Sequence, residues 1–325
     1  RGYAGRHPDV RQALATESAR LAQVHQENVA VRARNEKLPE AQVFTRELRV
    51  AESIAAARPP DEVISDVDSR VPKAARPNPN AIAIVIGNRD YAAQGVPKVD
   101  YAIQDAKSVR KYLVDAFGFS ADRVLLDTNV TSGRMSELFG TATDAGVGIL
   151  ADMISSRPDS SADVFVFYSG HGAPDGTPAK RYLVPVDANP DRLRATGYSV
   201  DQLYANLSTL KARSITVVID ACFSGLSDGG AVFQGRSAIG SGKIKVEVTT
   251  VTGSDSHVFA AAAVEQTARW RRDQGHSLFT YFFLKGLQGL ADADGNNEVT
   301  VGEMEAFVKV QVGTYALERL SGARQ

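Results

Sequence analysis

Short apolar runs alternate with longer amphipathic stretches through the middle of the chain. Residues 81–87 form a continuous apolar run of strand length, typical of a strand buried on both faces of a parallel sheet. The same pattern predicts further strands, at 123–127, 162–168, 181–186 and 214–219, with another apolar stretch at 257–264. Amphipathic stretches between them predict helices, at 100–117, 132–155, 200–210 and 277–290. Strands that alternate with helices indicate an α/β domain with a mainly parallel central sheet.

Residues 1–65 are predicted to form a helical extension of this domain. Apolar residues recur at helical spacing in two stripes, one within 9–36 and one within 41–54, and Pro59 and Pro60 end the second stripe. An extension of this kind could dock on the main domain, bind a protein partner or act as an inhibitory prosegment. The pattern alone leaves these alternatives open.

A proline-rich stretch separates the extension from the main domain. Residues 66–80 contain Pro72, Pro77 and Pro79 among polar neighbours, a composition typical of a linker. We therefore expect the main domain to occupy 81–325. The chain starts without an initiator methionine, so we expect a truncated or processed start, and a removed signal peptide and an upstream domain both stay open.

Composition excludes several classes of protein. The chain has 325 residues, 43% hydrophobic and 23% charged, as in an ordinary soluble globular protein. Its formal net charge of -1 provides no field that would attract nucleic acid or an anionic membrane, and no apolar run approaches the length of a membrane span. A single cysteine excludes an internal disulfide and any cysteine-based metal cluster. The role of that cysteine becomes the main question.

Two predicted strands end in reactive residues. His171 follows the strand at 162–168, and Cys222 follows the strand at 214–219, each within a glycine-containing segment that we expect to form a turn. Ligands of open α/β sheets bind beyond the carboxyl ends of the strands, so both side chains are expected at one edge of the sheet. The two residues can then meet although they are far apart in sequence.

A cysteine and a histidine in this arrangement can perform nucleophilic catalysis. A nearby imidazolium lowers the pKa of a thiol and so produces a thiolate at neutral pH. Cys222 would attack the scissile carbonyl, and His171 would protonate the leaving amine and then activate water against the thioester. The backbone N–H groups of Gly172 and Cys222 are candidates for stabilising the oxyanion. No metal or organic cofactor is required.

Simpler roles exist for both residues. A lone cysteine is often a small buried apolar residue, and a turn histidine often serves only as a hydrogen-bonding group. Both interpretations are weakened because the two residues follow strands in a similar way. His257 and His276 are interpreted as structural.

The segments around these residues resemble those of a known family. Tyr168-Ser-Gly-His-Gly172 and Asp220-Ala-Cys-Phe-Ser-Gly225 are similar to the histidine and cysteine boxes of the caspase-like superfamily, above all of bacterial metacaspases, also called orthocaspases. The resemblance runs from 81 to about 312. It implies a caspase-like α/β sandwich, with a mainly parallel sheet flanked by helices, and cysteine endopeptidase activity. The clostripain and gingipain lineage is the alternative enzyme class.

The resemblance also implies a substrate preference. Metacaspases carry an Asp two residues before the nucleophile and another on the first helix, and these positions match Asp220 and Asp105. Two carboxylates in a confined site favour Arg or Lys, so protein or peptide substrates with basic residues are the expected partners. The simpler alternatives are a helix-surface carboxylate for Asp105 and a hydrogen-bonding partner to a turn for Asp220.

Self-cleavage is a related hypothesis. The polar, glycine-rich segment at 227–243 contains Arg236 and Lys243, and flexible segments of this kind are readily cut. An uncleaved substrate-binding loop is the alternative, and the sequence does not decide between the two.

A segment near the C-terminus is similar to a calcium-binding loop. Oxygen-bearing side chains occupy the positions typical of an EF-hand loop at Asp292, Asp294, Asn296, Thr300 and Glu303. Asn297 takes the place of the usual glycine, and asparagine tolerates a left-handed backbone. A polar turn between two helices explains the same residues, so Ca²⁺ as a cofactor stays open.

Three functional classes follow from these observations. The first is a cysteine endopeptidase, the second a non-catalytic caspase-like scaffold that recruits partners through its N-terminal helices, and the third a calcium-responsive interaction module. A scaffold would not require both Cys222 and His171, so the sequence favours the enzyme.

Overall fold

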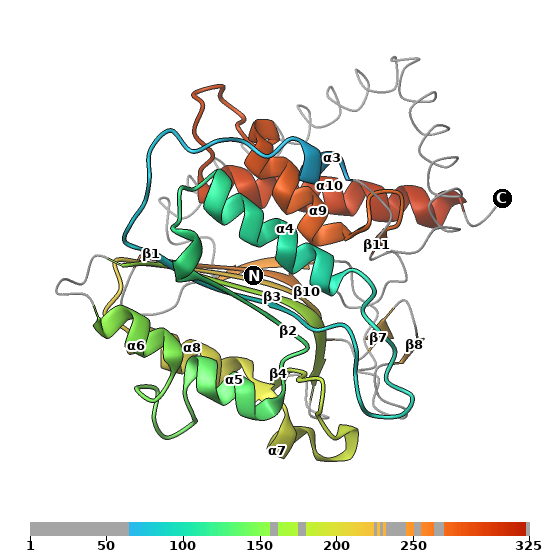
Figure 1. The fold of residues 1–325 in the computed structure, drawn as a ribbon. Helices are drawn as coiled ribbons and strands as arrows, with labels where there is room; N and C mark the ends of the chain where they lie inside the picture. The colour runs from blue at the N-terminus through green and yellow to red at the C-terminus, as the bar shows by residue number, and fades with distance from the viewer. Residues whose placement is uncertain are drawn as a thin grey trace, which may run out of the picture. The chain divides into compact units, whose positions relative to one another are not determined.

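The domain is built around a mainly parallel sheet, as the sequence predicts (Figure 1). The computed structural model describes residues 65–156, 162–174, 180–223, 226–227, 230–231, 245–249, 255–262 and 270–322. The helices predicted before residue 65 and the basic residues Arg236 and Lys243 lie outside these ranges. The main strands lie in the order β2 (Val124–Thr128), β1 (Ala81–Gly87), β3 (Asp163–Pro174), β6 (Ser214–Cys222), β10 (Asp255–Ala262) and β9 (Lys245–Thr249). Neighbouring strands in this order are parallel except for β9, which pairs antiparallel with β10.

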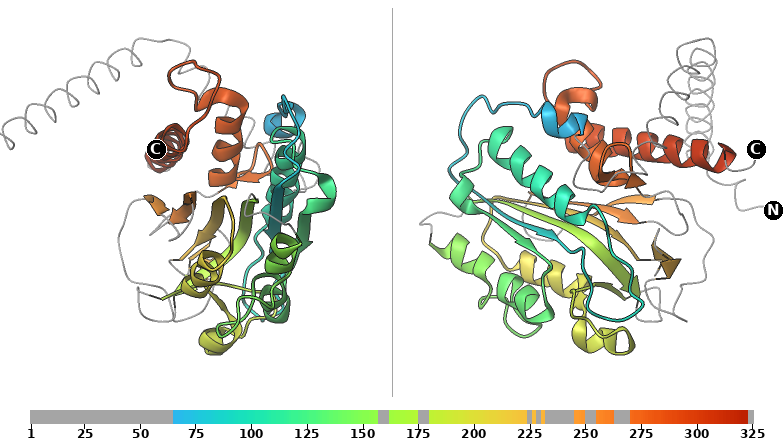
Figure 2. Two further views of the ribbon diagram at one scale, coloured as in Figure 1. Left: turned by 90° about the vertical axis from the view of Figure 1, so that its left-hand side faces the viewer. Right: turned by 45° about the vertical axis from the view of Figure 1, so that its right-hand side comes forward.

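Helices cover both faces of the sheet (Figures 1 and 2). Successive side chains of a strand point to opposite faces, and those of β1 divide between two apolar cores, with Val85 in one and Ile84 and Ile86 in the other. The first core includes residues of α4 (Ala102–Asp115), α9 (Leu278–Lys285) and α10 (Val301–Gly322). The second includes residues of α5 (Ser132–Phe139), α6 (Ile149–Ser155) and α8 (Val200–Ser208). Burial on both faces explains why the strand is apolar at every position.

Shorter elements complete the described part of the chain. β4 (Arg181–Leu183) pairs antiparallel with the end of β3, and β5 (Tyr198–Ser199) pairs with β4. The others are α3 (Asp66–Ser69), α7 (Leu193–Thr196), β7 (Leu226–Ser227), β8 (Gly230–Ala231), β11 (Trp270–Arg271), β12 (His276–Ser277), two 3-10 turns (Ala121–Arg123 and Pro190–Arg192) and a π-helical turn (Gly286–Leu290). Among the described helices, none combines the length and the apolar character needed to cross a bilayer.

The single helix predicted at 132–155 is wrong. The chain leaves the helix at Gly140, whose φ of 88° is a left-handed value that favours glycine, and it becomes helical again at Ile149. Carbonyl groups at the end of α5 bond to side chains of another segment: Tyr198 donates to the oxygen of Gly140 at 2.9 Å, and Asn206 donates to that of Phe139 at 2.9 Å. These tertiary hydrogen bonds stabilise the break.

The strands that lead to His171 and Cys222 are longer than predicted. β3 and β6 pair in parallel register from Asp163 and Ser214 through to His171 and Cys222. The pairing does not stop at the ends of the apolar runs, because each strand supplies the other with backbone partners. His171 and Cys222 therefore lie within strands, and the prediction that they lie in turns is wrong.

The proline-rich stretch at 66–80 begins with a helix packed on the domain. Val67, in α3, is fully buried within the first apolar core, and Tyr112 of α4 donates a hydrogen bond to its carbonyl oxygen at 2.8 Å. The composition predicts a linker, but the first residues of this stretch form part of the domain's packing.

Candidate active site

His171 and Cys222 are neighbours across two central strands. The parallel register of β3 and β6 makes them Cα partners, and adjacent strands lie roughly 4.8 Å apart. The sheet thus brings together in space two residues that are far apart in sequence. Gly172 follows on β3 opposite Leu183 of β4. The oxyanion role of the N–H groups of Gly172 and Cys222 stays a prediction.

The imidazole ring of His171 is fixed in one orientation. Its Nε2 lies 2.7 Å from the carbonyl oxygen of Pro97, and because a carbonyl only accepts, Nε2 carries the proton. The lone pair of the neutral ring is then on Nδ1. Tyr91 packs against the ring with centroids 4.6 Å apart, and its hydroxyl accepts the backbone N–H of His171 at 2.8 Å. The sequence could not reveal the orienting group, because a backbone carbonyl has no side-chain signature.

The glycines on either side of His171 are required by packing. A Cβ atom on Gly170 would lie 2.8 Å from the hydroxyl of Tyr168 and 2.9 Å from that of Tyr91. A Cβ atom on Gly172 would lie 2.8 Å from the ring of Phe223. All three distances are shorter than normal van der Waals contact. Aromatic side chains therefore fill the space in which a larger residue at either glycine position would place its Cβ atom.

Asp105 is fully buried in a network of hydrogen bonds. It lies in the first turn of α4 and accepts from the hydroxyl of Ser277 at 2.7 Å, the hydroxyl of Ser169 at 3.3 Å and Nδ1 of His276 at 2.7 Å. The interpretation of Asp105 as a helix-surface carboxylate is therefore wrong. Ser169 precedes His171 on β3 by two residues, so this network adjoins the strand that carries the histidine.

Asp220 lies beside Asp105, and the same serine bonds to both. The hydroxyl of Ser277 contacts Oδ2 of Asp220 as well as Oδ2 of Asp105. Oδ2 of Asp220 also accepts from the N–H and the hydroxyl of Thr280, at 3.2 and 2.6 Å, so it binds the N-terminal turn of α9 rather than a loop turn. We call Asp105 and Asp220 the acidic pair. The structure brings together the two carboxylates that the family resemblance selects.

The pKa of Asp220 is raised. Burial contributes most, the negative charge of Asp105 adds to it, and the hydrogen bonds from Ser277 and Thr280 oppose it, which leaves the pKa at about 6. Two carboxylates that are close together and poorly hydrated disfavour each other's charge. A cation bound between them would relieve that repulsion.

His276, which the sequence analysis interprets as structural, is a further charged group at this site. Its ring is fully buried. Burial alone would lower the pKa of His276, but its hydrogen bonds to Asp105 and Asp68 outweigh burial and raise the pKa to about 9. The ring is therefore charged at neutral pH. The family resemblance, which runs from 81 to about 312, includes His276 but assigns it no role.

The calcium-loop residues form a compact turn before α10. Carboxylate oxygens of Asp292, Asp294 and Glu303 lie within 4.8 Å of one another. Each carboxylate accepts backbone N–H groups of the loop itself, and Asn297 has the positive φ, 66°, expected at its position. These bonds fit a polar turn, and the binding of Ca²⁺ by Asp292, Asp294, Asn296 and Glu303 stays a prediction.

Comparisons with known proteins support the resemblance to the caspase-like superfamily. A family model described as the caspase domain matches residues 80–316, which span β1 to α10. Among solved structures, caspase-1 from Spodoptera frugiperda is 17% identical, with 77% of this chain and 83% of that chain covered and a TM-score of 0.45. A second structure, described as pro-sf-caspase-1, is 16% identical, with 74% and 81% covered and a TM-score of 0.41. No curated protein sequence matches this chain. The fold is thus the caspase-like α/β fold, with the match beginning after α3.

Proposed function

Since this chain belongs to the caspase-domain family, we propose that it is a cysteine endopeptidase that cleaves after Arg or Lys, with Cys222 as nucleophile and His171 as acid and base. The observation that carries this proposal is the register of β3 and β6, which makes the two residues direct neighbours. Asp220 at the cysteine box and Asp105 on α4 favour the metacaspase or orthocaspase type within the family.

The reaction needs one proton to move at each stage. Nδ1 of His171 takes the thiol proton, the sulfur attacks the scissile carbonyl, and the oxyanion accepts backbone N–H groups, for which Gly172 and Cys222 are the candidates. The C–N bond breaks as the imidazolium protonates the amine, which leaves a thioester. His171 then removes a proton from water, the hydroxide attacks the thioester, and the acid product leaves as the thiol is restored. Donation from Nε2 to Pro97 holds the ring in the tautomer that this cycle uses.

The acidic pair supports selection of a basic side chain. Asp105 and Asp220 both contact the hydroxyl of Ser277, so their carboxylates lie close together, and a guanidinium pairs with carboxylates in a planar, bidentate arrangement. An acidic side chain would add a third negative charge to the same place. The expected order of preference is therefore Arg, then Lys, with Asp excluded.

Self-processing is part of the same proposal. Arg236 and Lys243 lie in a polar, glycine-rich segment after the cysteine box, and a peptidase selective for basic residues has its own recognition sites there. Mass spectrometry of the purified chain beside Cys222→Ala tests this directly. Fragments that end at Arg236 or Lys243 only in the wild type are expected, and identical intact masses would contradict self-processing.

Hydrolysis of peptides tests the peptidase assignment. Fluorogenic peptides that differ only in Arg, Lys or Asp before the cleaved bond should be assayed with the wild type and Cys222→Ala, each with calcium and with EGTA. Hydrolysis of the Arg and Lys peptides that is lost in Cys222→Ala is expected. Equal rates in the two proteins, or no hydrolysis under either condition, would overturn the assignment.

A further inference from the structure

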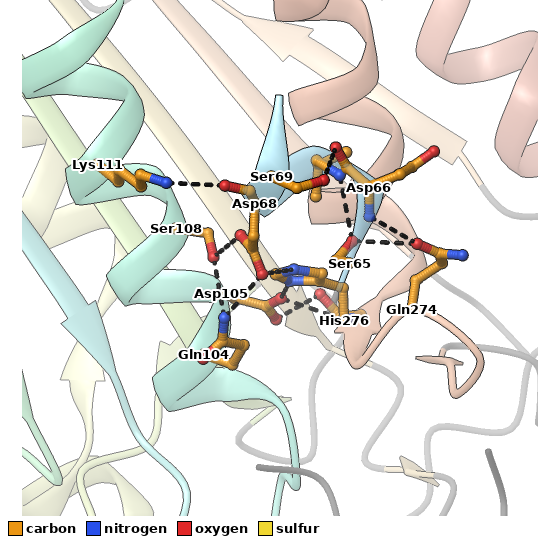
Figure 3. Close-up of polar contacts among 12 residues, drawn as sticks. Ser65, Asp66, Asp68, Ser69, Gln104, Asp105, Ser108, Lys111, Gln274 and His276 are labelled. Atoms are coloured by element: carbon orange, nitrogen blue, oxygen red, sulfur yellow. Dashed lines mark hydrogen bonds and ion pairs between the residues drawn. The ribbon is translucent and has the colours of Figure 1, made fainter. Parts of the chain in front are cut away.

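His276 connects the acidic pair to the helix that precedes the sheet (Figure 3). Its Nδ1 lies 2.7 Å from Oδ1 of Asp105, and its Nε2 lies 3.2 Å from Oδ2 of Asp68. Carboxylates accept hydrogen bonds, so both ring nitrogens donate and the ring carries a positive charge. One buried imidazolium thus joins a carboxylate of the acidic pair to a carboxylate of α3.

Asp68 is also bonded to the helix that carries Asp105 (Figure 3). Its carboxylate accepts from Gln104 at 2.9 Å and from the hydroxyl of Ser108, and its carbonyl oxygen accepts from Lys111 at 2.7 Å. Gln104, Ser108 and Lys111 follow one another at spacings of four and three residues, so they share one face of α4. Asp68 therefore fixes α3 against α4.

A second set of contacts fixes α3 against the segment that leads to His276. The side-chain oxygen of Gln274 accepts from the hydroxyl of Ser65 at 3.2 Å and from the N–H of Asp66 at 3.1 Å. Lys285 of α9 pairs with Asp66 at 3.1 Å. Gln274 precedes His276 by only two residues, so this second set of contacts lies next to the segment that carries His276.

These contacts come from outside the region that matches the family. The caspase-domain model begins at residue 80, whereas α3 ends at Ser69. The contribution of Asp68 is thus an addition to the family's matched domain.

The charges explain why Asp68 matters for a bound cation. Asp68 and Asp105 both bond to the single positive charge of His276, and Asp220 shares Ser277 with Asp105, so three carboxylates accompany one imidazolium and leave an excess of negative charge for a substrate cation. Without the carboxylate of Asp68, the imidazolium would neutralise Asp105 alone and repel an approaching guanidinium more strongly. The ring of His276, which bonds to Asp105, would also lose one of the two carboxylates that hold it in position.

We propose that Asp68 is a positioning residue for substrate recognition, which through His276 holds Asp105 beside Asp220 and so adds one carboxylate of α3 to the residues that select Arg or Lys. This inference rests on the proposed function. It assigns to the start of the described chain a role in the selection of the substrate.

The test compares Asp68→Asn with Asp66→Asn in the full chain. Both changes remove a carboxylate from α3, but only Asp68 contacts His276, so Asp66→Asn controls for weakened docking of the helix. For the Arg peptide we expect Asp68→Asn to raise KM about tenfold with kcat within about twofold, as for a lost binding interaction, and Asp66→Asn to leave both constants near the wild-type values. NMR of the His276 ring should show its titration midpoint lowered only in Asp68→Asn.

Each outcome decides the question. An unchanged KM in Asp68→Asn, or an equal rise in Asp66→Asn, would overturn the inference while peptide cleavage by the wild type upholds the proposed function. Absence of Arg or Lys cleavage by the wild type would instead overturn the proposed function and the inference with it. If Asp68→Asn does not fold, His276→Gln, which keeps a donor toward Asp105 and loses the charge, replaces it with the same expected rise in KM.

Discussion

The Nε2 atom of His171 lies 2.7 Å from the carbonyl oxygen of Pro97. This bond assigns the proton to Nε2 and the lone pair of the neutral ring to Nδ1. A peptidase built in this way has a Cys-His dyad whose histidine is oriented by a backbone carbonyl of the loop after β1. The histidine can then act as base and acid through Nδ1, while the hydrogen bond from Nε2 fixes the orientation of the ring.

Removal of the imidazole should abolish most of the activity. We expect His171→Ala to lower kcat/KM for the Arg peptide by roughly 10²–10⁴-fold, the usual contribution of a general acid and base. Alkylation of Cys222 by iodoacetamide at neutral pH should also slow, because the thiolate loses its partner. His257→Ala, which removes a histidine from β10, is the matched control and should retain wild-type rates. Full activity in His171→Ala would contradict the assignment.

Asp220→Asn should stabilise the protein at neutral pH. The pKa of Asp220 in the folded chain is about 6, above the ordinary value of 3.8, so folding favours its protonated form. Its favourable contribution is complete below pH 3.8 and is lost as the pH rises through 6. The variant should therefore gain on the order of 1 kcal/mol at pH 7.5, seen in denaturant unfolding, and the gain should vanish near pH 4.

Asp115→Asn provides the comparison for that measurement. Asp115 forms an ion pair with Lys73 at 3.0 Å and lies at the other end of α4 from Asp105, so its removal relieves no repulsion. No gain in stability is expected at any pH. A gain equal to that of Asp220→Asn would show that the effect is one of net charge and not of the acidic pair.

Binding of the basic substrate should weaken in mild acid. The groups that face Asp220 are Asp105 from α4 and Ser277 and Thr280 at the start of α9, so protonation of Asp220 removes one of two charges available to a guanidinium. KM for the Arg peptide should rise on the order of tenfold from pH 7.5 to pH 5. In Asp220→Asn the KM should be high and nearly constant over this range. The same pH dependence in both proteins would exclude Asp220 as the titrating group.

Gly170→Ala should destabilise the fold. The added Cβ atom would lie 2.8 Å from the hydroxyl of Tyr168 and 2.9 Å from that of Tyr91, which also holds His171, so the strand must shift. We expect a loss of about 1–3 kcal/mol in thermal or denaturant unfolding. Gly133→Ala is the matched change, since nothing lies within 4 Å of its added Cβ atom in α5, and it should gain up to about 1 kcal/mol. Equal effects of the two substitutions would contradict the packing account.

The architecture could be predicted from sequence where burial is continuous. The apolar run at 81–87 has the bounds of β1, because every side chain of that strand is buried and none breaks the pattern. The helix predicted at 132–155 was wrong because its apolar spacing persists across a break at Gly140 that depends on tertiary bonds from Tyr198 and Asn206. Local periodicity contains no information about such bonds.

The sequence identified the candidate catalytic residues, but it did not identify the groups that hold them in position. Cys222 and His171 were identified as residues that follow strands, although pairing between β3 and β6 places both within the strands. The carbonyl of Pro97 has no sequence signature. The link from Asp68 to His276 joins residues 208 positions apart, so only the folded chain brings them together. Polar composition predicted a linker where a buried valine and a partly buried hydrogen-bond network fix α3 to the domain.

Covalent labelling tests most directly whether Cys222 attacks a carbonyl that follows a basic residue. Two peptide chloromethyl ketones, identical except for Arg or Asp beside the reactive group, should be incubated with the wild-type chain and the modified residue located by mass spectrometry. We predict one adduct on Cys222, formed at least about tenfold faster with the arginyl reagent than with the aspartyl reagent. Equal rates for the two reagents, or an adduct on any residue other than Cys222, would contradict this prediction.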